Sequence, residues 1–280
     1  MNLFEQIAVA WQSLIRVFAA MRRGRLWAPF ALLAASEALV VLALVWFAHP
    51  LLSWFMVPLL RQVSGETTLR YPNLFRVLPG LYAQADVFIG AVVGAIVVGA
   101  ATVMFADYFH GTKPSASAGF GEAWRRSLAL ILANLPFNLL VFGLGHWSQD
   151  FLTSRSSGQL VQGIVYFLIL GISVVLQSLF FYVSALVVLE RRSVLSALAG
   201  LPETWARGFW AATFIGGLLI TPLLPIHYIS DRAGVIVDRG VPELTGWVVA
   251  VQGLIGLALW FLLTGSATLV YLSLVRREDT

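Results

Sequence analysis

The chain has 280 residues, of which 59% are hydrophobic and only 11% are charged, and its formal net charge is +4. Water-soluble domains carry about 25% charged residues, so this composition excludes a soluble globular enzyme and a disordered chain. The mean hydropathy of +0.84 indicates an integral membrane protein. There is no cysteine, which excludes disulfides and cysteine-ligated metal sites.

Residues 1–26 are predicted to form an amphipathic helix that lies in the membrane interface. Arg22, Arg23 and Arg25 follow its apolar residues, whereas the basic residues of a signal peptide precede them. Apolar residues recur at helical spacing, at Leu3, Phe4, Ile7, Ala8, Trp11, Leu14, Ile15 and Phe18. Polar residues take the other side: Asn2, Glu5, Gln6, Gln12, Ser13 and Arg16.

Six later segments are long and apolar enough to cross a membrane as helices, which takes about 20 residues each. They lie within a domain of residues 27–280 and cover 28–48, 87–105, 127–144, 163–189, 209–229 and 247–272. Their hydrophobicity is continuous and does not alternate, which disfavours the strands of a membrane barrel. We therefore predict an all-α fold, a polytopic membrane helical bundle with six transmembrane helices.

The Lys and Arg residues predict how these helices are oriented. Twelve of the 18 basic residues fall on the side of the N-terminus, and the loops on the other side hold the remaining six. The positive-inside rule then places both termini in the cytoplasm. Because the basic residues flank apolar segments, we expect them to meet lipid head groups and not nucleic acid.

An internal repeat is indicated when the chain is shifted against itself by 81 residues. The paired identities are Glu122 with Glu203, Trp124 with Trp205, Arg126 with Arg207, His146 with His227, and Asp150 with Asp231. They are polar or rare residues at both ends of a predicted span. The shift therefore predicts repeated helical hairpins, and three hairpins would supply the six helices.

The loop after the fourth span carries a recognisable pattern. Glu190-Arg191-Arg192 is followed by Ala197-Leu198, Trp205 and Gly208-Phe209-Trp210, and the last span closes with Tyr271-Leu272. This pattern resembles the six-helix bacterial membrane family typified by the glycerophosphoryl diester phosphodiesterase membrane domain. The family's usual Ser after Ala-Leu is replaced here by Leu201, Pro202 follows, and the Gly sits one place late.

That resemblance implies a membrane-embedded domain of a bacterial inner membrane protein. In the namesake of the family, this domain accompanies a separate soluble phosphodiesterase domain. These 280 residues contain no such domain, so the phosphodiesterase activity is not carried over.

Several polar residues lie inside the predicted spans. Glu37 is near the middle of the first, and Asn134, Asn138, Gln177 and Gln252 lie in later ones. No Lys or Arg occurs within any predicted span. Such residues either hold helices together by hydrogen bonds or take part in a proton relay or ligand contact, and the sequence leaves both open.

Two strips of small residues predict close helix packing within the bundle, with the seating of a partner's helix as the alternative. Gly90 and Gly94 form a Gly-x-x-x-Gly pair in the second span, and Gly253 and Gly256 form a similar strip in the sixth.

Metal and catalytic sites are disfavoured. His49, His146 and His227 fall at the same ends of odd-numbered spans, but no two have the i, i+4 spacing that places two ligands on one helix face, so we predict no metal site. No nucleophile elbow, zinc-protease or phosphate-loop motif is present, so we predict no catalytic residues and no enzyme. The sequence identifies no cofactor.

The leading hypothesis is a non-catalytic inner-membrane protein, either an accessory or scaffold subunit of a membrane complex or a lipid-associated module. Its expected partners are membrane lipids and other membrane subunits. The alternative is a transporter or permease component in which Glu37 and the Asn134/Asn138 face line a polar path. Pro136, Pro222 and Pro225, which are expected to break two spans, favour this alternative.

Overall fold

The protein is described by a computed structural model that covers residues 2–154 and 159–275, with the backbone alone for 145–154, 159–163, 166 and 275. The described residues are helical, with connecting turns and no strand. Six helical stretches are long and apolar enough to cross a membrane: Gly24–Val45, Asn73–Phe109, Ser127–Leu144, Phe167–Val188, Val194–Ser230 and Glu243–Leu274. The all-α bundle with six transmembrane helices is thus confirmed, and the chain is a multi-pass membrane protein.

Two of these stretches are much longer than predicted. Asn73–Phe109 has 37 residues and is about 55 Å long at 1.5 Å per residue, against a hydrocarbon core of about 30 Å. Its first part remains helical because Leu74, Leu78 and Tyr82 recur at four-residue spacing and are buried on one face. Local hydropathy does not report such a face, so the predicted span began only at residue 87.

The chain folds into two compact units. Unit 1 comprises Met1–Phe30, Gly90–Ile220 and Trp260–Thr280, and unit 2 comprises Ala31–Ile89 and Thr221–Leu259. Two helices pass from one unit into the other: α2 (Ala28–Val45) at its start and α13 (Glu243–Val270) near its middle.

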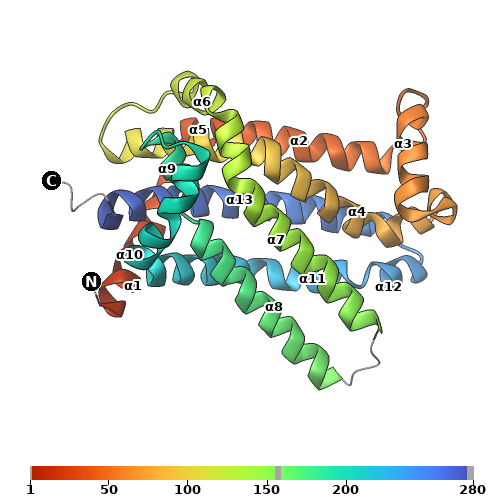
Figure 1. The fold of residues 1–280 in the computed structure, drawn as a ribbon. Helices are drawn as coiled ribbons and strands as arrows, with labels where there is room; N and C mark the ends of the chain where they lie inside the picture. Colours follow the sequence, from red (N-terminus) through yellow and green to blue (C-terminus); the bar gives the residue numbers. More distant parts are fainter. Residues whose placement is uncertain (1, 155–158, 276–280) are drawn as a thin grey trace. The chain divides into compact units, whose positions relative to one another are not determined.

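Unit 1 contains most of the helices. In chain order they are α1 (Leu3–Ala20), the 3₁₀ turn η1 (Gly24–Trp27), the π-helical turn η3 (Gly90–Gly94), α5 (Ala95–Phe109), α6 (Ala116–Arg125), α7 (Ser127–Ser154), α8 (Gln159–Phe180), α9 (Val183–Val188), α10 (Val194–Ile220), the end of α13, and the π-helical turn η5 (Tyr271–Val275). α7 and α8 pack together as a helical hairpin (Figure 1). α5 approaches α7 closely, because a Cβ at Gly99 would lie 2.5 Å from Leu130 Cδ1.

The two segments related by the 81-residue shift have the same local form. In each, a short helix with an i, i+4 ion pair precedes a span: Arg126 with Glu122 at 3.1 Å, and Arg207 with Glu203 at 2.8 Å. In each, one residue interrupts the helical backbone before the span begins. These residues are Arg126 (φ −112°, ψ 13°), between α6 and α7, and Gly208 (φ −122°, ψ 20°), inside α10.

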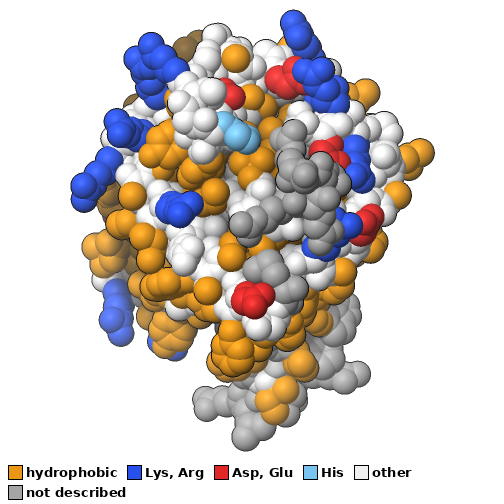
Figure 2. Space-filling model, turned by 90° about the vertical axis from the view of Figure 1, so that its left-hand side faces the viewer, with side chains coloured by type: hydrophobic (Ala, Val, Ile, Leu, Met, Phe, Trp, Pro, Cys, Tyr) orange, Lys and Arg blue, Asp and Glu red, His pale blue; other side chains and the backbone are white. Residues whose placement is uncertain are grey.

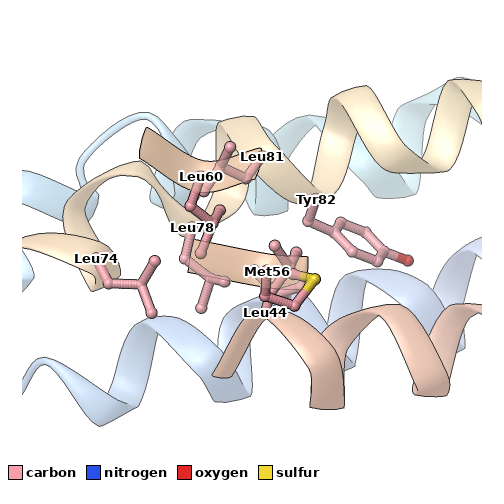
Figure 3. Packing of buried hydrophobic residues seen from close by; sticks show 8 residues of the cluster. Leu44, Met56, Leu60, Leu74, Leu78, Leu81 and Tyr82 are labelled. Carbon is pink, nitrogen blue, oxygen red and sulfur yellow. The ribbon is translucent and has the colours of Figure 1, made fainter. Parts of the chain in front are cut away.

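Unit 2 contains α2, α3 (Pro50–Ser64), the 3₁₀ turn η2 (Glu66–Leu69), α4 (Asn73–Ile89), the 3₁₀ turn η4 (Thr221–Leu223), α11 (Leu224–Ser230), α12 (Ala233–Asp238) and the first part of α13. In Figure 1, α3 stands across the direction of α2 and α4. Figure 3 shows the core of this unit, formed by Leu44, Met56, Leu60, Leu74, Leu78, Leu81, Tyr82 and Val249. The hydroxyl of Tyr82 points away from the leucines.

Polar side chains of unit 2 connect the segment around α4 to the ends of α12 and α13. Arg76 of α4 forms an ion pair with Asp238 at the end of α12. The Tyr71 hydroxyl donates a hydrogen bond of 2.8 Å to Glu243 in the first turn of α13.

Pro136 and Pro222 have different effects on the helices that contain or precede them. α7 continues as a helix through Pro136, so the expected break of the third span is wrong. α10 ends at Ile220, and Pro222 lies in the 3₁₀ turn η4 that follows it. A proline removes one backbone hydrogen bond, and within a membrane helix neighbouring groups can compensate for that loss.

Candidate functional site

The least solvent-exposed carboxyl group of unit 2 belongs to Glu37 of α2. Its side chain is only 6% exposed and accepts a hydrogen bond from the hydroxyl of Tyr82 on α4. A third helix completes the group: a Cβ at Gly253 of α13 would lie 3.0 Å from the Tyr82 hydroxyl oxygen and 3.2 Å from Glu37 Oε2. The absence of a side chain at Gly253 therefore makes room for this hydrogen-bonded pair.

A second carboxyl group lies beside this pair. Asp86 follows Tyr82 by one helical turn on α4, and it lies close enough for its charge to act on Glu37. A charge inside a membrane helix is costly, so two neighbouring carboxyl groups mark this part of unit 2 as a candidate functional site. We call Glu37, Tyr82 and Asp86 the acid cluster.

The sequence identified Glu37 but missed its two partners. The predicted second span begins at Val87, so it leaves out Asp86 by a single residue and does not reach Tyr82. The available signal was the i, i+4 spacing of Tyr82 and Asp86, which places both on one face of a helix.

The other polar residues of the spans make local or pairwise contacts. The side-chain amide of Asn134 donates to the Leu130 carbonyl at 2.8 Å, and that of Asn138 donates to the Asn134 carbonyl at 3.0 Å. Both amide groups therefore bind the backbone of their own helix. In unit 2, Gln252 accepts a hydrogen bond of 3.4 Å from Ser230. In unit 1, Gln177 faces α10, where a Cβ at Gly216 would lie 3.4 Å from Gln177 Oε1.

The four glycines predicted for packing have different environments. Gly253 meets the acid cluster, whereas a Cβ at Gly256 would meet nothing within 4 Å. Gly90 and Gly94 begin and end the π-helical turn η3. Gly94 is buried, while a Cβ at Gly90 would be in open space.

The histidines do not gather in the part of the chain that the structure describes. His49 is the exposed N-cap of α3, and its Nδ1 accepts a hydrogen bond of 3.3 Å from the Leu51 amide. His227 is exposed on α11, and the side chain of His146 lies outside the described residues. Over the described side chains, no group of three or more His, Asp or Glu residues is placed to hold a metal.

The residues of the recognisable pattern meet at one end of unit 1. The buried Tyr271 donates a hydrogen bond to Glu190, whose carboxylate also pairs with Arg192 at 2.6 Å. The buried Tyr182 donates its hydroxyl to the Gly208 carbonyl at 3.1 Å, where the backbone of α10 is interrupted. These two tyrosines fix the turn between α9 and α10 and the kink of α10.

Glu122 reinforces the same turn from α6. Its carboxylate pairs with Arg126 at 3.1 Å and with Arg191 at 3.6 Å, and Arg126 also donates to the Val187 carbonyl at 3.3 Å. Arg191 adopts a positive φ of 57°, which is uncommon for a residue with a side chain. The pairs with Glu122 therefore stabilise a reversal of the chain.

The same end of unit 1 also carries basic residues that pair with none of the carboxylates that the structure describes. Of its described Lys and Arg residues, six form no ion pair with any described carboxylate: Arg16, Arg22, Arg23, Arg25, Lys113 and Arg125. Figure 2 shows this face, with Lys and Arg side chains around its rim and hydrophobic side chains between them. We call it the basic end.

Comparisons with known proteins add no assignment. No protein-family model, curated protein or solved structure matches the chain. Conclusions about function therefore rest on the chemistry of the acid cluster and of the basic end.

Proposed function

We propose that this chain is a non-catalytic module of the bacterial inner membrane that works by association, holding lipids at its basic end and serving as an accessory or scaffold subunit. The observation that carries the proposal is that this end holds two separate sets of residues, one that stabilises the turns and one that is exposed. Glu122, Glu190, Tyr182 and Tyr271 are engaged in contacts that stabilise the turns. The basic residues that pair with no described carboxylate are exposed beside them, together with large apolar side chains.

The short helices of unit 1 support this interpretation. Each of α1, α6 and the start of α10 precedes a span and exposes large apolar side chains, such as Phe4 at 79%, Trp124 at 71% and Leu195 at 80%. Exposed apolar residues next to basic ones are typical of helices that lie in a membrane interface. Under the positive-inside rule, the basic end and both termini face the cytoplasm.

Native mass spectrometry of the full chain, purified in mild detergent at native expression level, tests the proposal. We expect a defined mass above 30.6 kDa that contains either bound phospholipid or further protein subunits. A bare monomer that retains neither and that moves a solute across reconstituted liposomes would overturn it.

A second function, a proton-coupled transporter component, is favoured by the acid cluster alone. Two carboxyl groups and a phenol on neighbouring membrane helices can exchange a proton. The Asn134/Asn138 face gives this function little support, because both side-chain amides donate to their own helix. Reconstituted protein with Glu37→Gln separates the two functions: loss of pH-driven flux in a folded variant supports transport, and absence of flux in the wild type excludes it.

A further inference from the structure

α1 presents three different faces around its axis. One is buried in unit 1 and contains Gln6, Ala10, Ser13, Leu14, Val17 and Ala20. A second is exposed and apolar, with Phe4, Trp11, Ile15 and Phe18. A third is exposed and polar, with Glu5, Gln12 and Arg16. At 3.6 residues per turn these faces are centred about 120° apart.

The buried face corrects the two-sided helix expected from the sequence. Gln6 and Ser13, which the periodicity assigned to the polar side, are 6% and 2% exposed. Gln6 Oε1 accepts a hydrogen bond of 3.0 Å from the Trp210 amide, two residues after the interruption at Gly208. This hydrogen bond ties α1 to α10 directly after the interruption.

The contacts of α1 also fix its depth. Trp210 lies at the start of the span in α10, and Gln6 lies against it. Towards the other end of α1, a Cβ at Gly265 would lie 2.5 Å from Val17 Cγ1 and 2.9 Å from Phe105 Cζ. Phe105 is one turn before the end of α5, or about 6 Å from it. α1 therefore lies where the spans of unit 1 begin and end, which is the depth of a membrane interface.

The chain leaves α1 through a well-held turn that presents three arginines. The Trp27 Nε1–H donates a hydrogen bond of 2.8 Å to the Met21 carbonyl, and the Trp27 ring stacks on Phe261 at 4.4 Å. Between these anchors, Arg22, Arg23 and Arg25 are exposed and form no ion pair with a described residue. Their positive charge is thus preorganised beside the apolar face.

We propose that α1 and the turn with Arg22, Arg23 and Arg25 form a binding surface for anionic phospholipids. The apolar face of Phe4, Trp11, Ile15 and Phe18 enters the border of the acyl chains, and the arginines bind the phosphate and the negative head group. Arginine suits this role because its planar guanidinium can donate two parallel hydrogen bonds to one phosphate. The inference rests on the proposed function, since it names the class of lipid that the module holds.

Charge and depth together favour a lipid over a protein as the occupant. The apolar face of α1 lies at the interface depth of its own unit, where acyl chains are already present, and the charge beside it is positive. The inner leaflet of a bacterial membrane offers negative charge at that depth.

The first test uses nanodiscs that contain equal amounts of phosphatidylcholine and phosphatidylglycerol. Native mass spectrometry of the released full-length protein counts the lipids of each kind that remain bound. We expect an excess of phosphatidylglycerol in the wild type and, in R22Q/R23Q/R25Q, an affinity for it at least about tenfold weaker. The matched control R61Q/R70Q/R239Q removes three arginines of unit 2 and should keep the excess.

The second test measures the depth of α1 directly. Because the chain has no cysteine, a spin label on a single introduced cysteine reports one position. In nanodiscs, I15C should be accessible to oxygen and Q12C to a water-soluble nickel complex. Equal behaviour of the two labels would contradict the three-faced placement of α1.

The outcomes distinguish this inference from the function on which it rests. If the wild type retains both lipids equally, or if the folded triple variant keeps the excess of phosphatidylglycerol, the anionic-lipid site at α1 is overturned. The proposed function, a module that holds lipids, is not affected by either result. If the wild-type protein retains neither lipid nor further subunits, both the lipid site and the proposed function are overturned. If the triple variant fails to fold, the three single variants replace it, and graded losses of phosphatidylglycerol are expected.

Discussion

Tyr271 and Glu190 are 81 residues apart in the chain and are joined by a hydrogen bond in which the tyrosine hydroxyl donates to the carboxylate. Glu190 follows α9, and Tyr271 begins the π-helical turn after α13. The bond therefore closes the end of the last span onto the turn that opens α10. Arg192 binds the same carboxylate, so the tyrosine and the arginine hold Glu190 from two sides.

Replacing Tyr271 by Phe should destabilise unit 1 while keeping the ring in its buried place. A hydrogen bond to a charged group contributes about 1.5–3 kcal/mol, and the variant should lose an amount in this range in a detergent unfolding titration. Tyr108→Phe is the control, because the Tyr108 hydroxyl forms no hydrogen bond with a described residue. Equal stability of the two variants would show that the Tyr271 bond contributes little.

The contact between Glu37 and Tyr82 should appear as a coupling in a double-mutant cycle. Glu37→Leu and Tyr82→Phe each leave the other polar group without its partner, so the two changes together should cost less than their sum. Hydrogen bonds between membrane helices contribute about 0.6 kcal/mol on average and up to about 1.7. The coupling should lie in this range when measured by unfolding in a bilayer-mimicking detergent.

A control cycle pairs Glu37→Leu with Tyr71→Phe. Tyr71 bonds Glu243 and not Glu37, so its coupling to Glu37 should be close to zero. A coupling as large as that of Tyr82 would mean that the first cycle reports a general loss of packing. Glu37→Gln, which keeps an acceptor for the Tyr82 hydroxyl, should be milder than Glu37→Leu.

Gly253 and Gly256 should respond differently to alanine, although the sequence placed them in one strip. A Cβ at Gly253 meets the oxygens of Tyr82 and Glu37 at 3.0 and 3.2 Å, and one at Gly256 meets nothing within 4 Å. Both substitutions gain the same helix propensity, so their difference isolates the contact. We expect Gly253→Ala to be less stable than Gly256→Ala by about 1 kcal/mol.

The sequence predicted the six spans because the length of an apolar run and the lack of charge are local properties. It did not include Asp86 in the second helical stretch, since α4 is kept helical before residue 87 by Leu74 and Leu78, whose partners come from α2 and α3. Nor could it bury Gln6, whose partner is the amide of Trp210, a residue 204 positions away in the chain. Both misses concern tertiary contacts: the spacing of Tyr82 and Asp86 marks a shared helix face, but it does not show which other helices pack on that face.

The pattern around Glu190 differs from these two cases, because its residues could be recognised from the sequence although their contacts could not. The family resemblance of these residues remains a prediction. Their contacts are structural: Glu190 binds Tyr271, and Gly208 accepts from Tyr182. A Cβ at Gly208 would lie 2.2 Å from the Tyr182 hydroxyl oxygen, so this glycine is needed for the close approach of the tyrosine.

The packing of α6 on α5 provides the sharpest comparison between two variants. Gly119 and Gly121 lie on the same short helix. A Cβ at Gly119 would lie 2.8 Å from the Ala100 carbonyl oxygen and 3.0 Å from Met104 Cγ, whereas one at Gly121 would meet nothing within 4 Å. The Ala100 oxygen belongs to the backbone of α5 and cannot rotate away, so a methyl group at Gly119 must push the two helices apart.

Gly119→Ala should therefore destabilise the protein by about 1–3 kcal/mol, while Gly121→Ala should be neutral or slightly stabilising because alanine favours the helix. Unfolding titrations of both variants in one detergent measure the difference. Separation of α6 from α5 should also expose Ala123, which is fully buried in the intact helix pair, so A123C should react with a water-soluble thiol reagent faster in the Gly119→Ala background. Equal stability and equal labelling of the two glycine variants would mean that α6 does not pack on α5 at this distance.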